Sequence, residues 1–275
     1  MSLLLGVAAS VLIGISDTFG RASSRRAEPI SHVSMQMAVG VLVAVPVALL
    51  LRNEIRVDDL AMGLVSGALI ALGLSLLYRA MAESSSAVAA PAASVLVALI
   101  PLIWDLLGGA ELSSLAALGC VIALASLVLT TYSPTDSKTS LRGLGLAALA
   151  GVFLGVSVIF AADTNPDSGA WPAASQRLAG FVAMLMLARL RSVPAFLPPG
   201  IRRFGYLGGV AGALGMISWI IGAQLGELGV VSIVASTSPA VVALLATKFD
   251  EDTIRPLQAL GVAGAIAGTI LIVLS

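Results

Sequence analysis

The feature that most constrains this 275-residue chain is an internal duplication, in which the second half restates motifs of the first half in the same order. The matched elements are Gly14-x-Ser16-x-x-Phe19 with Gly155-x-Ser157-x-x-Phe160, Gln36 with Gln176, Ser94 with Ser238, and Gly119 with Gly261, at offsets of 141, 140, 144 and 142 residues. Because the order is kept and the offsets vary little, these pairs predict two structural repeats, residues 1–133 and residues 141–275.

Composition places both repeats in a lipid bilayer. Hydrophobic residues make up 58% of the chain and charged residues 11%, against about 25% charged residues in a typical soluble domain. The mean hydropathy is +1.03. Apolar runs close to the roughly 20 residues that a helix needs to cross the hydrocarbon fall at 2–20, 31–51, 60–81, 86–107, 113–132, 142–162, 171–190, 204–225, 229–248 and 256–275. We therefore expect an all-α, multi-pass membrane protein with ten transmembrane helices in one integral membrane domain.

The number of spans in each repeat determines how the repeats are related. Each repeat holds five predicted spans, and five is an odd number of crossings. The second repeat must then enter the membrane from the opposite side, which gives two inverted five-helix repeats. Secondary transporters use this architecture, with a binding site near the middle of the bilayer between the repeats.

Basic residues in the short loops predict the orientation. Twelve of the fifteen Lys and Arg residues fall on the side of the loop around Arg25 and Arg26, whereas Arg52 and Arg56 fall on the other side. Cytoplasmic loops are enriched in such residues, so we expect both termini outside the cytoplasm. The predicted location is the inner, or cytoplasmic, cell membrane.

The sequence gives little support for nucleic-acid binding, for a metal or cofactor site, or for enzymatic catalysis. The net charge is zero and there is no basic stripe, so nucleic acid is not an expected partner. Cys120 is the only cysteine, and we expect neither a metal site nor a cofactor. The only histidine, His32, lies at a predicted span boundary, and no histidine follows Ser157 as a general base. We expect no enzymatic activity; a channel-like facilitator and an intramembrane enzyme are the alternatives.

Two charged residues within the predicted spans are candidate site residues, because charges in hydrocarbon usually face protein or a water-filled cavity. Arg177 could anchor a substrate carboxylate through its planar guanidinium; alternatively, its stem reaches the nearby interface. Asp17 could bind a coupling proton or a cationic substrate. Alternatively, it caps its helix beside Arg21 or pairs with Arg177.

Several uncharged residues complete the candidate set. Gln36 and Gln176 could contact a zwitterion from two sides, or each could bridge helices. The substrate-binding candidates also include Ser16, Ser157, Ser238 and Trp219, although serines often bond their own helix and a deep indole often only packs. Pro239 is the predicted kink or gating residue.

Several motifs resemble the drug/metabolite transporter superfamily, and more narrowly its EamA-type members. They are the paired Gly-x-Ser-x-x-Phe segments, Ser175-Gln176-Arg177-Leu178-Ala179-Gly180 and Ser236-Thr237-Ser238-Pro239, with the acidic turn Asp250-Glu251-Asp252. The first half departs from the pattern: Val95, or alternatively the nearby Pro101, stands where the second half has Pro239, and Met37 stands where it has Arg177. The resemblance implies two inverted five-helix repeats around a central cavity. It also implies transport of small metabolites, such as amino acids or drugs, by alternating access.

The expected partners are a small-molecule substrate, the lipid bilayer and, if Asp17 couples, protons. The last predicted span carries Gly261, Gly264 and Gly268, a small-residue surface that favours close helix packing. If this surface packs against another helix of the same chain, we expect a monomer. If it packs against a second copy of the chain, we expect a weak homodimer.

Overall fold

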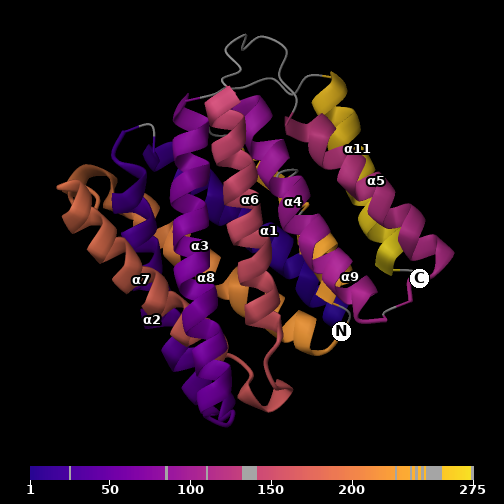
Figure 1. Cartoon of the computed structure of the whole chain (residues 1–275), viewed down its shortest axis with the longest axis horizontal. Helices are drawn as coiled ribbons and strands as arrows, with labels where there is room; N and C mark the ends of the chain where they lie inside the picture. The colour runs from indigo at the N-terminus through magenta and orange to yellow at the C-terminus, as the bar shows by residue number, and fades with distance from the viewer. Residues whose placement is uncertain are drawn as a thin grey trace.

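All regular elements in the described part of the chain are helices (Figure 1). The computed structural model describes residues 1–24, 26–83, 86–109, 111–131, 141–226, 228–235, 237–238, 241–242, 245 and 256–273. The α-helices are α1 (Ser2–Ser24), α2 (Pro29–Leu51), α3 (Val57–Glu83), α4 (Ser86–Leu107), α5 (Ser114–Thr131), α6 (Leu141–Ala162), α7 (Trp171–Arg191), α8 (Arg202–Gln224), α9 (Leu228–Ala235) and α11 (Pro256–Val273). Two short 3₁₀ helices, η1 (Pro166–Ser168) and η2 (Pro199–Ile201), lie in loops.

Proline and the left-handed backbone conformation set the ends of corresponding helices in the two halves. Pro29 opens α2 and Pro172 lies in the first turn of α7, where the missing N–H has no helical partner to lose. Arg52 ends α2 with φ +53°, and Ser192 ends α7 with φ +54°. The Arg52 N–H donates to Leu49 O, and the Ser192 N–H donates back into the last turn of α7. The duplication therefore extends to the local chemistry of helix ends.

Each of the ten predicted spans contains a described helix, although α9 ends at Ala235 within the ninth. Within the described residues, the segments long and apolar enough to cross a membrane are Ser2–Ser24, Pro29–Leu51, Val57–Ala80, Leu141–Ala162 and Pro199–Gln224. Shorter apolar helices cover Ala93–Leu107, Ser114–Ser126 and Ala259–Gly268. The coarse expectation, an all-helical chain with membrane-length helices, is met. The count of ten complete crossings and the inversion of the repeats stay predictions.

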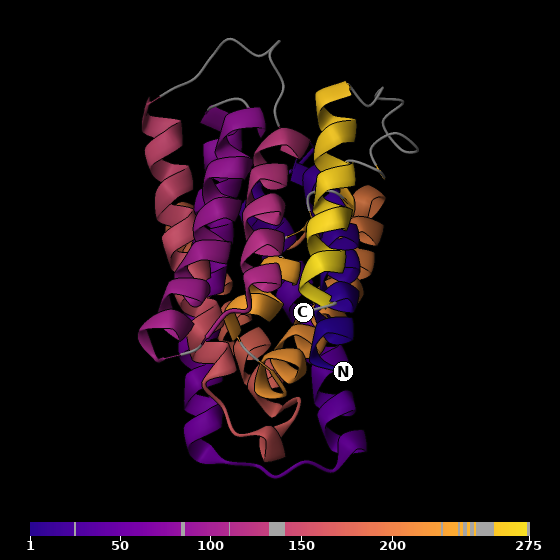
Figure 2. The ribbon, with the colours of Figure 1, turned by 90° about the vertical axis from the view of Figure 1, so that its right-hand side faces the viewer.

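The two halves interleave instead of packing as separate bundles. Helix α1 packs mainly on α8, and its counterpart α6 packs on α3 and α4. Likewise α2 packs on α7 and α8, whereas α7 packs on α2 and α3. Helices α5 and α11 form a pair at one edge of the molecule, seen at the right of Figure 1 and facing the viewer in Figure 2. The main packing partners of a helix in one half are therefore the counterparts of the packing partners of the equivalent helix in the other half.

Close approaches between helices also come in corresponding pairs. A Cβ at Gly67 of α3 would collide with the backbone oxygen of Gln176, and a Cβ at Gly209 of α8 would lie 3.0 Å from the backbone oxygen of Gln36. Glycine at both positions lets the helices approach closely, and dispersion then contributes to packing within lipid. These contacts bring both glutamines of the duplicated motif to helix crossings. The predicted repeat limits at residues 133 and 141 border residues 132–140, which lie outside the described part.

Candidate functional site

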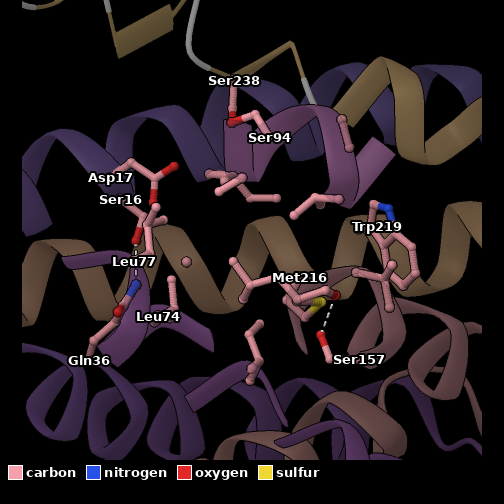
Figure 3. A pocket seen from close by; sticks show the side chains of 18 of the residues that line it. Ser16, Asp17, Gln36, Leu74, Leu77, Ser94, Ser157, Met216, Trp219 and Ser238 are labelled. Atoms are coloured by element: carbon pink, nitrogen blue, oxygen red, sulfur yellow. Dashed lines mark hydrogen bonds between the residues drawn. The ribbon is translucent and has the colours of Figure 1, made fainter. Parts of the chain in front are cut away.

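A cavity of about 170 Å³ lies between the halves, with lining residues from α1, α2, α3, α4, α6, α7, α8 and α9 and with Ser238 beyond α9 (Figure 3). Most of its wall is apolar, supplied by Ile13, Ile70, Leu74, Leu77, Ala93, Val97, Leu154, Val158, Met216 and Ala235. The polar groups on the wall are few: Ser16, Asp17, Gln36, Ser94, Ser157, Arg177, Trp219 and Ser238. Such a mostly apolar cavity with a few placed polar groups is typical of small-molecule sites.

One end of the cavity is polar. Gln36 Nε2 donates to Ser16 Oγ at 2.7 Å, and Ser16 Oγ donates to Gly208 O at 2.8 Å, which joins α2, α1 and α8. Asp17 lies beside this group, as Figure 3 shows. The Gln36 Oε1 atom is buried and has no partner among the described residues. A free carbonyl acceptor is therefore available next to the Asp17 carboxylate.

Arg177 is 3% exposed and lines the cavity from α7. Its Nη2 donates to Gly212 O at 2.6 Å, and its Nη1 lies 3.4 Å from Met37 Sδ. Gly40 makes room for the stem, since a Cβ there would lie 2.7 Å from Arg177 Cδ. This burial rules out the alternative in which the stem reaches the membrane interface.

Arg177 and Asp17 do not pair with each other, so the alternative of an ion pair between them is not observed. Within the described part of the chain, no carboxylate comes within 4.0 Å of Arg177, and no residue donates a hydrogen bond to Asp17. The Nε atom of Arg177 also lacks a partner there. Two charged groups therefore lie in the same cavity without a counter-charge. A buried charge that is not paired is costly.

The other end of the cavity holds Trp219, Met216 and Ser157 (Figure 3). Trp219 is 3% exposed and presents an aromatic surface at this end. Ser157 Oγ donates to Leu154 O of its own helix at 2.7 Å. Ser94 and Ser238, which correspond in the duplication, lie along a third part of the wall.

The structure places Ser16, Asp17, Gln36, Ser157, Arg177, Trp219 and Ser238 around one cavity, and their roles in binding stay predictions. Gln176 does not line the cavity. It is fully buried, and its Nε2 donates to Ser66 Oγ at 2.8 Å. Ser66 Oγ in turn donates to Ser157 O at 2.6 Å. Pro239 lies outside the described residues.

Sequence reasoning missed the groups that hold Arg177, namely Met37 and the Gly212 carbonyl. The duplication carried a usable signal, because Met37 corresponds to Arg177 and the two side chains meet. Within the described part, no group of three His, Cys, Asp or Glu side chains gathers to hold a metal ion. The site therefore offers opposite charges, amide and hydroxyl groups and an aromatic face as its binding chemistry.

Comparison with known proteins identifies the family of the chain. The sequence matches the EamA-like transporter family twice, over residues 1–132 and over residues 141–274. The double match defines the class of protein, a multi-pass membrane transporter of small solutes. More specifically, the chain belongs to the EamA-like transporter family, which is generally non-enzymatic.

A solved crystal structure, one of 29 matching chains, superposes with a TM-score of 0.79 over 99% of this chain and 98% of its own, at 18% sequence identity. This likeness shows the fold alone. No curated protein sequence matches the chain.

Proposed function

We propose that this protein is a secondary transporter that moves small zwitterionic metabolites, such as amino acids, across the cytoplasmic membrane by alternating access. The observation that carries the proposal is the pair of unmatched charges in one cavity, Arg177 and Asp17. A solute with both a carboxylate and an ammonium group supplies both missing counter-charges at once. A solute with a single charge leaves one of them buried and unpaired, which is costly.

Arg177 is the proposed carboxylate ligand. Its guanidinium presents several N–H donors in a plane and suits a carboxylate better than a lysine does. The bond from Nη2 to Gly212 O fixes the group, while Nε has no partner among the described residues. Binding therefore costs little reorganisation of this side chain.

Asp17 and Gln36 are the proposed ligands of the ammonium group. Both offer oxygen acceptors at the same end of the cavity, and the bond to Ser16 holds Gln36 in place. Asp17 is also the proposed proton-coupling residue when no ammonium group occupies it. Trp219 at the other end provides an apolar surface for the side chain of the solute.

Alternating access follows from the proposed arrangement of two inverted five-helix repeats. The interleaved packing supports it, because every main contact of α1 has a counterpart in α6, and every main contact of α2 has one in α7. The lining residues come from both halves, so a relative movement of the halves would change access to the cavity from either side. The kink proposed at Pro239 stays a prediction.

The proposed assembly is a monomer. The glycine face of α11 is already occupied within the chain, since a Cβ at Gly268 would lie 2.8 Å from Gly119 O and Ala123 N of α5. The small-residue surface that could have supported a homodimer thus serves the α5–α11 contact.

Counterflow in proteoliposomes tests the proposed function. Vesicles are loaded with one unlabelled standard L-amino acid at a time, and entry of the same labelled compound is followed. The matched controls are the corresponding amine, which lacks the carboxylate, and the corresponding carboxylic acid, which lacks the ammonium group. We expect saturable counterflow for at least one amino acid and loss of it for both controls. Counterflow of the single-charge compounds alone would contradict the zwitterion proposal, and non-saturating flux would favour the channel alternative.

A further inference from the structure

Two guanidinium groups, one from each half of the chain, lie over the same aromatic ring. Arg26 comes from the loop that joins α1 to α2, and Arg203 comes from the first turn of α8. Their Cζ atoms lie 5.7 Å and 5.1 Å from the centroid of the Phe204 ring. A cation is attracted to the face of an aromatic ring at such distances. The ring therefore holds both side chains close to each other.

The position of Phe204 is itself set by contacts with α1 and α2. Its ring lies 6.2 Å from that of Phe19 of α1, centroid to centroid, at an interplanar angle of 35°. The next residue, Gly205, lets α8 approach α2 closely, since a Cβ there would lie 2.6 Å from Met35 Sδ. The two arginines are thus placed by the packing of three helices.

Neither guanidinium group of this pair has a polar partner within the described part of the chain, where both side chains are exposed. Other arginines at helix ends do have partners. Arg202 Nε donates to Leu197 O at 3.0 Å, and Arg56 lies 3.8 Å from both Glu54 and Asp59. Like charges repel, so two unpaired guanidinium groups beside one ring favour an anion that contacts both. A phosphate group accepts charge-assisted hydrogen bonds from such donors.

An exposed stripe of α8 begins at Arg203 and continues along the helix. Tyr206, Leu207, Val210 and Leu214 follow at intervals of three and four residues, which keeps them on one face. They are 53%, 50%, 41% and 37% exposed, respectively. At 1.5 Å per residue the stripe is about 16 Å long, close to half of the roughly 30 Å of hydrocarbon in a bilayer. Its length therefore fits the acyl chains of one leaflet.

We propose that Arg26 and Arg203 bind the phosphate of an anionic phospholipid, and that its acyl chains lie along the exposed stripe of α8. Tyr206 stands one turn after Arg203, where the amphipathic ring of a tyrosine suits the boundary between headgroups and hydrocarbon. The predicted orientation puts this end of α8 on the cytoplasmic side, and the cytoplasmic leaflet is negatively charged. The bound phosphate joins the two halves of the chain at this side of the membrane.

Native mass spectrometry of the full chain in a non-ionic detergent tests the proposal. The probes are phosphatidylglycerol and phosphatidylcholine with identical acyl chains, titrated at roughly physiological ionic strength. Phosphatidylcholine carries a choline cation that would meet the two guanidinium groups. We expect phosphatidylglycerol to bind about tenfold more tightly or better, as charge-assisted hydrogen bonds imply. Equal affinities for the two lipids would overturn the proposal.

Two single variants and a matched control test which residues hold the phosphate. Arg26→Gln and Arg203→Gln should each weaken phosphatidylglycerol binding about tenfold or more. Both side chains are exposed, so the substitutions leave the helix packing intact. Arg191→Gln is the control, because Arg191 is also exposed and ends α7 on the same predicted side. It should weaken binding at most about fivefold, the general contribution of one basic residue near an anionic surface. Equal losses in all three variants would show general attraction only and would overturn the site.

Competition with glycerol 1-phosphate tests the contribution of the acyl chains. This soluble compound has the phosphate of the lipid but cannot cover the stripe of α8. We expect it to leave phosphatidylglycerol bound at equal concentration. Displacement of the lipid would show that the site takes a free phosphate, and the lipid proposal would fail. Lipid binding is measured without transport, so these results are independent of the proposed transport function.

Discussion

Gln36 and Gln176 occupy the same place in the two halves, yet only one of them faces the cavity. Each amide nitrogen donates to a serine hydroxyl that bonds a backbone carbonyl of a third helix. In the first half the serine is Ser16 of α1, beside the cavity. For Gln176 the serine is Ser66 of α3, which also belongs to the first half and lies away from the cavity, and Gln176 is completely enclosed. One copy of the amide therefore serves the site and the other serves helix packing.

At the next position along the chain, the residue of the second half lines the cavity and that of the first half does not. Met37 follows Gln36, whereas Arg177 follows Gln176, and the two side chains meet between α2 and α7. At these two positions, the first half supplies the amide that lines the cavity, and the second half supplies the guanidinium. The equivalent positions of the two repeats have therefore diverged, so that each contributes a different polar group to one cavity.

Arg177→Met, which copies the first half into the second, should have the largest effect. Transport kcat/KM should fall roughly tenfold to hundredfold, because a hydrogen bond to a charged group contributes about 1.5–3 kcal/mol. Thermal stability should hold, since the change removes an unpaired buried cation and keeps side-chain volume. Initial-rate uptake with purified protein measures the first quantity. Met37→Leu is the control and should transport normally; equal losses in both variants would show that packing alone is responsible.

The pair Gly67 and Gly209 should differ in stability. A Cβ at Gly67 would meet the Gln176 backbone, whereas at Gly209 the nearest atom is Val39 Cβ, at 2.5 Å. Overpacking costs about 1–3 kcal/mol, and we expect Gly67→Ala to lie at the top of that range and Gly209→Ala below it. Unfolding of both variants in detergent gives the comparison. A more stable Gly67→Ala protein would contradict the close α3–α7 crossing.

Substitution of the two glutamines should affect different quantities, substrate binding for Gln36 and protein stability for Gln176. Gln36→Ala should raise KM roughly threefold to tenfold, as expected from the loss of one hydrogen bond of about 0.5–1.5 kcal/mol. Gln176→Ala should leave KM unchanged and lower stability by about 0.6–1.7 kcal/mol, the range measured for bonds between membrane helices. Paired uptake and unfolding measurements provide the test. If Gln176→Ala raises KM as much as Gln36→Ala, the division between the two halves is wrong.

The smallest difference should lie between Ser16 and Ser157. Ser16 joins three helices, whereas Ser157 bonds its own helix through Leu154 O. Ser157→Ala should change stability by less than about 0.5 kcal/mol, as most substitutions without a special mechanism do. Ser16→Ala should cost about 1 kcal/mol, since it also frees the Gln36 amide. A larger loss of stability in Ser157→Ala than in Ser16→Ala would contradict the proposed difference between the two serines.

Much of the fold could be predicted because its signals are local or repeated. Apolar length placed the helices, and constant offsets identified the duplication. The family match over both halves confirmed the resemblance. Which helix packs on which could not be read in the same way, because the lipid-facing and protein-facing sides of such helices have similar composition.

The site was only partly predictable for a related reason. Polar residues within apolar spans are few, so Asp17, Gln36 and Arg177 stood out in the sequence. Whether such a residue lines a cavity depends on partners far away in the chain, and Gln176 is enclosed by Ser66, at a separation of 110 residues. The surroundings of His32 likewise come from other helices, with Ser23 of α1, Tyr78 of α3 and Gly208 of α8 around its ring.

The interleaved packing of the halves has a consequence for biogenesis. The main neighbours of α1 are α8 and α9, and those of α3 are α6 and α7. When residues 1–131 have left the ribosome, these helices have no permanent partners yet and must wait in lipid or against the insertion machinery. A prematurely terminated chain would keep those surfaces unmatched, which makes it a target for membrane quality control.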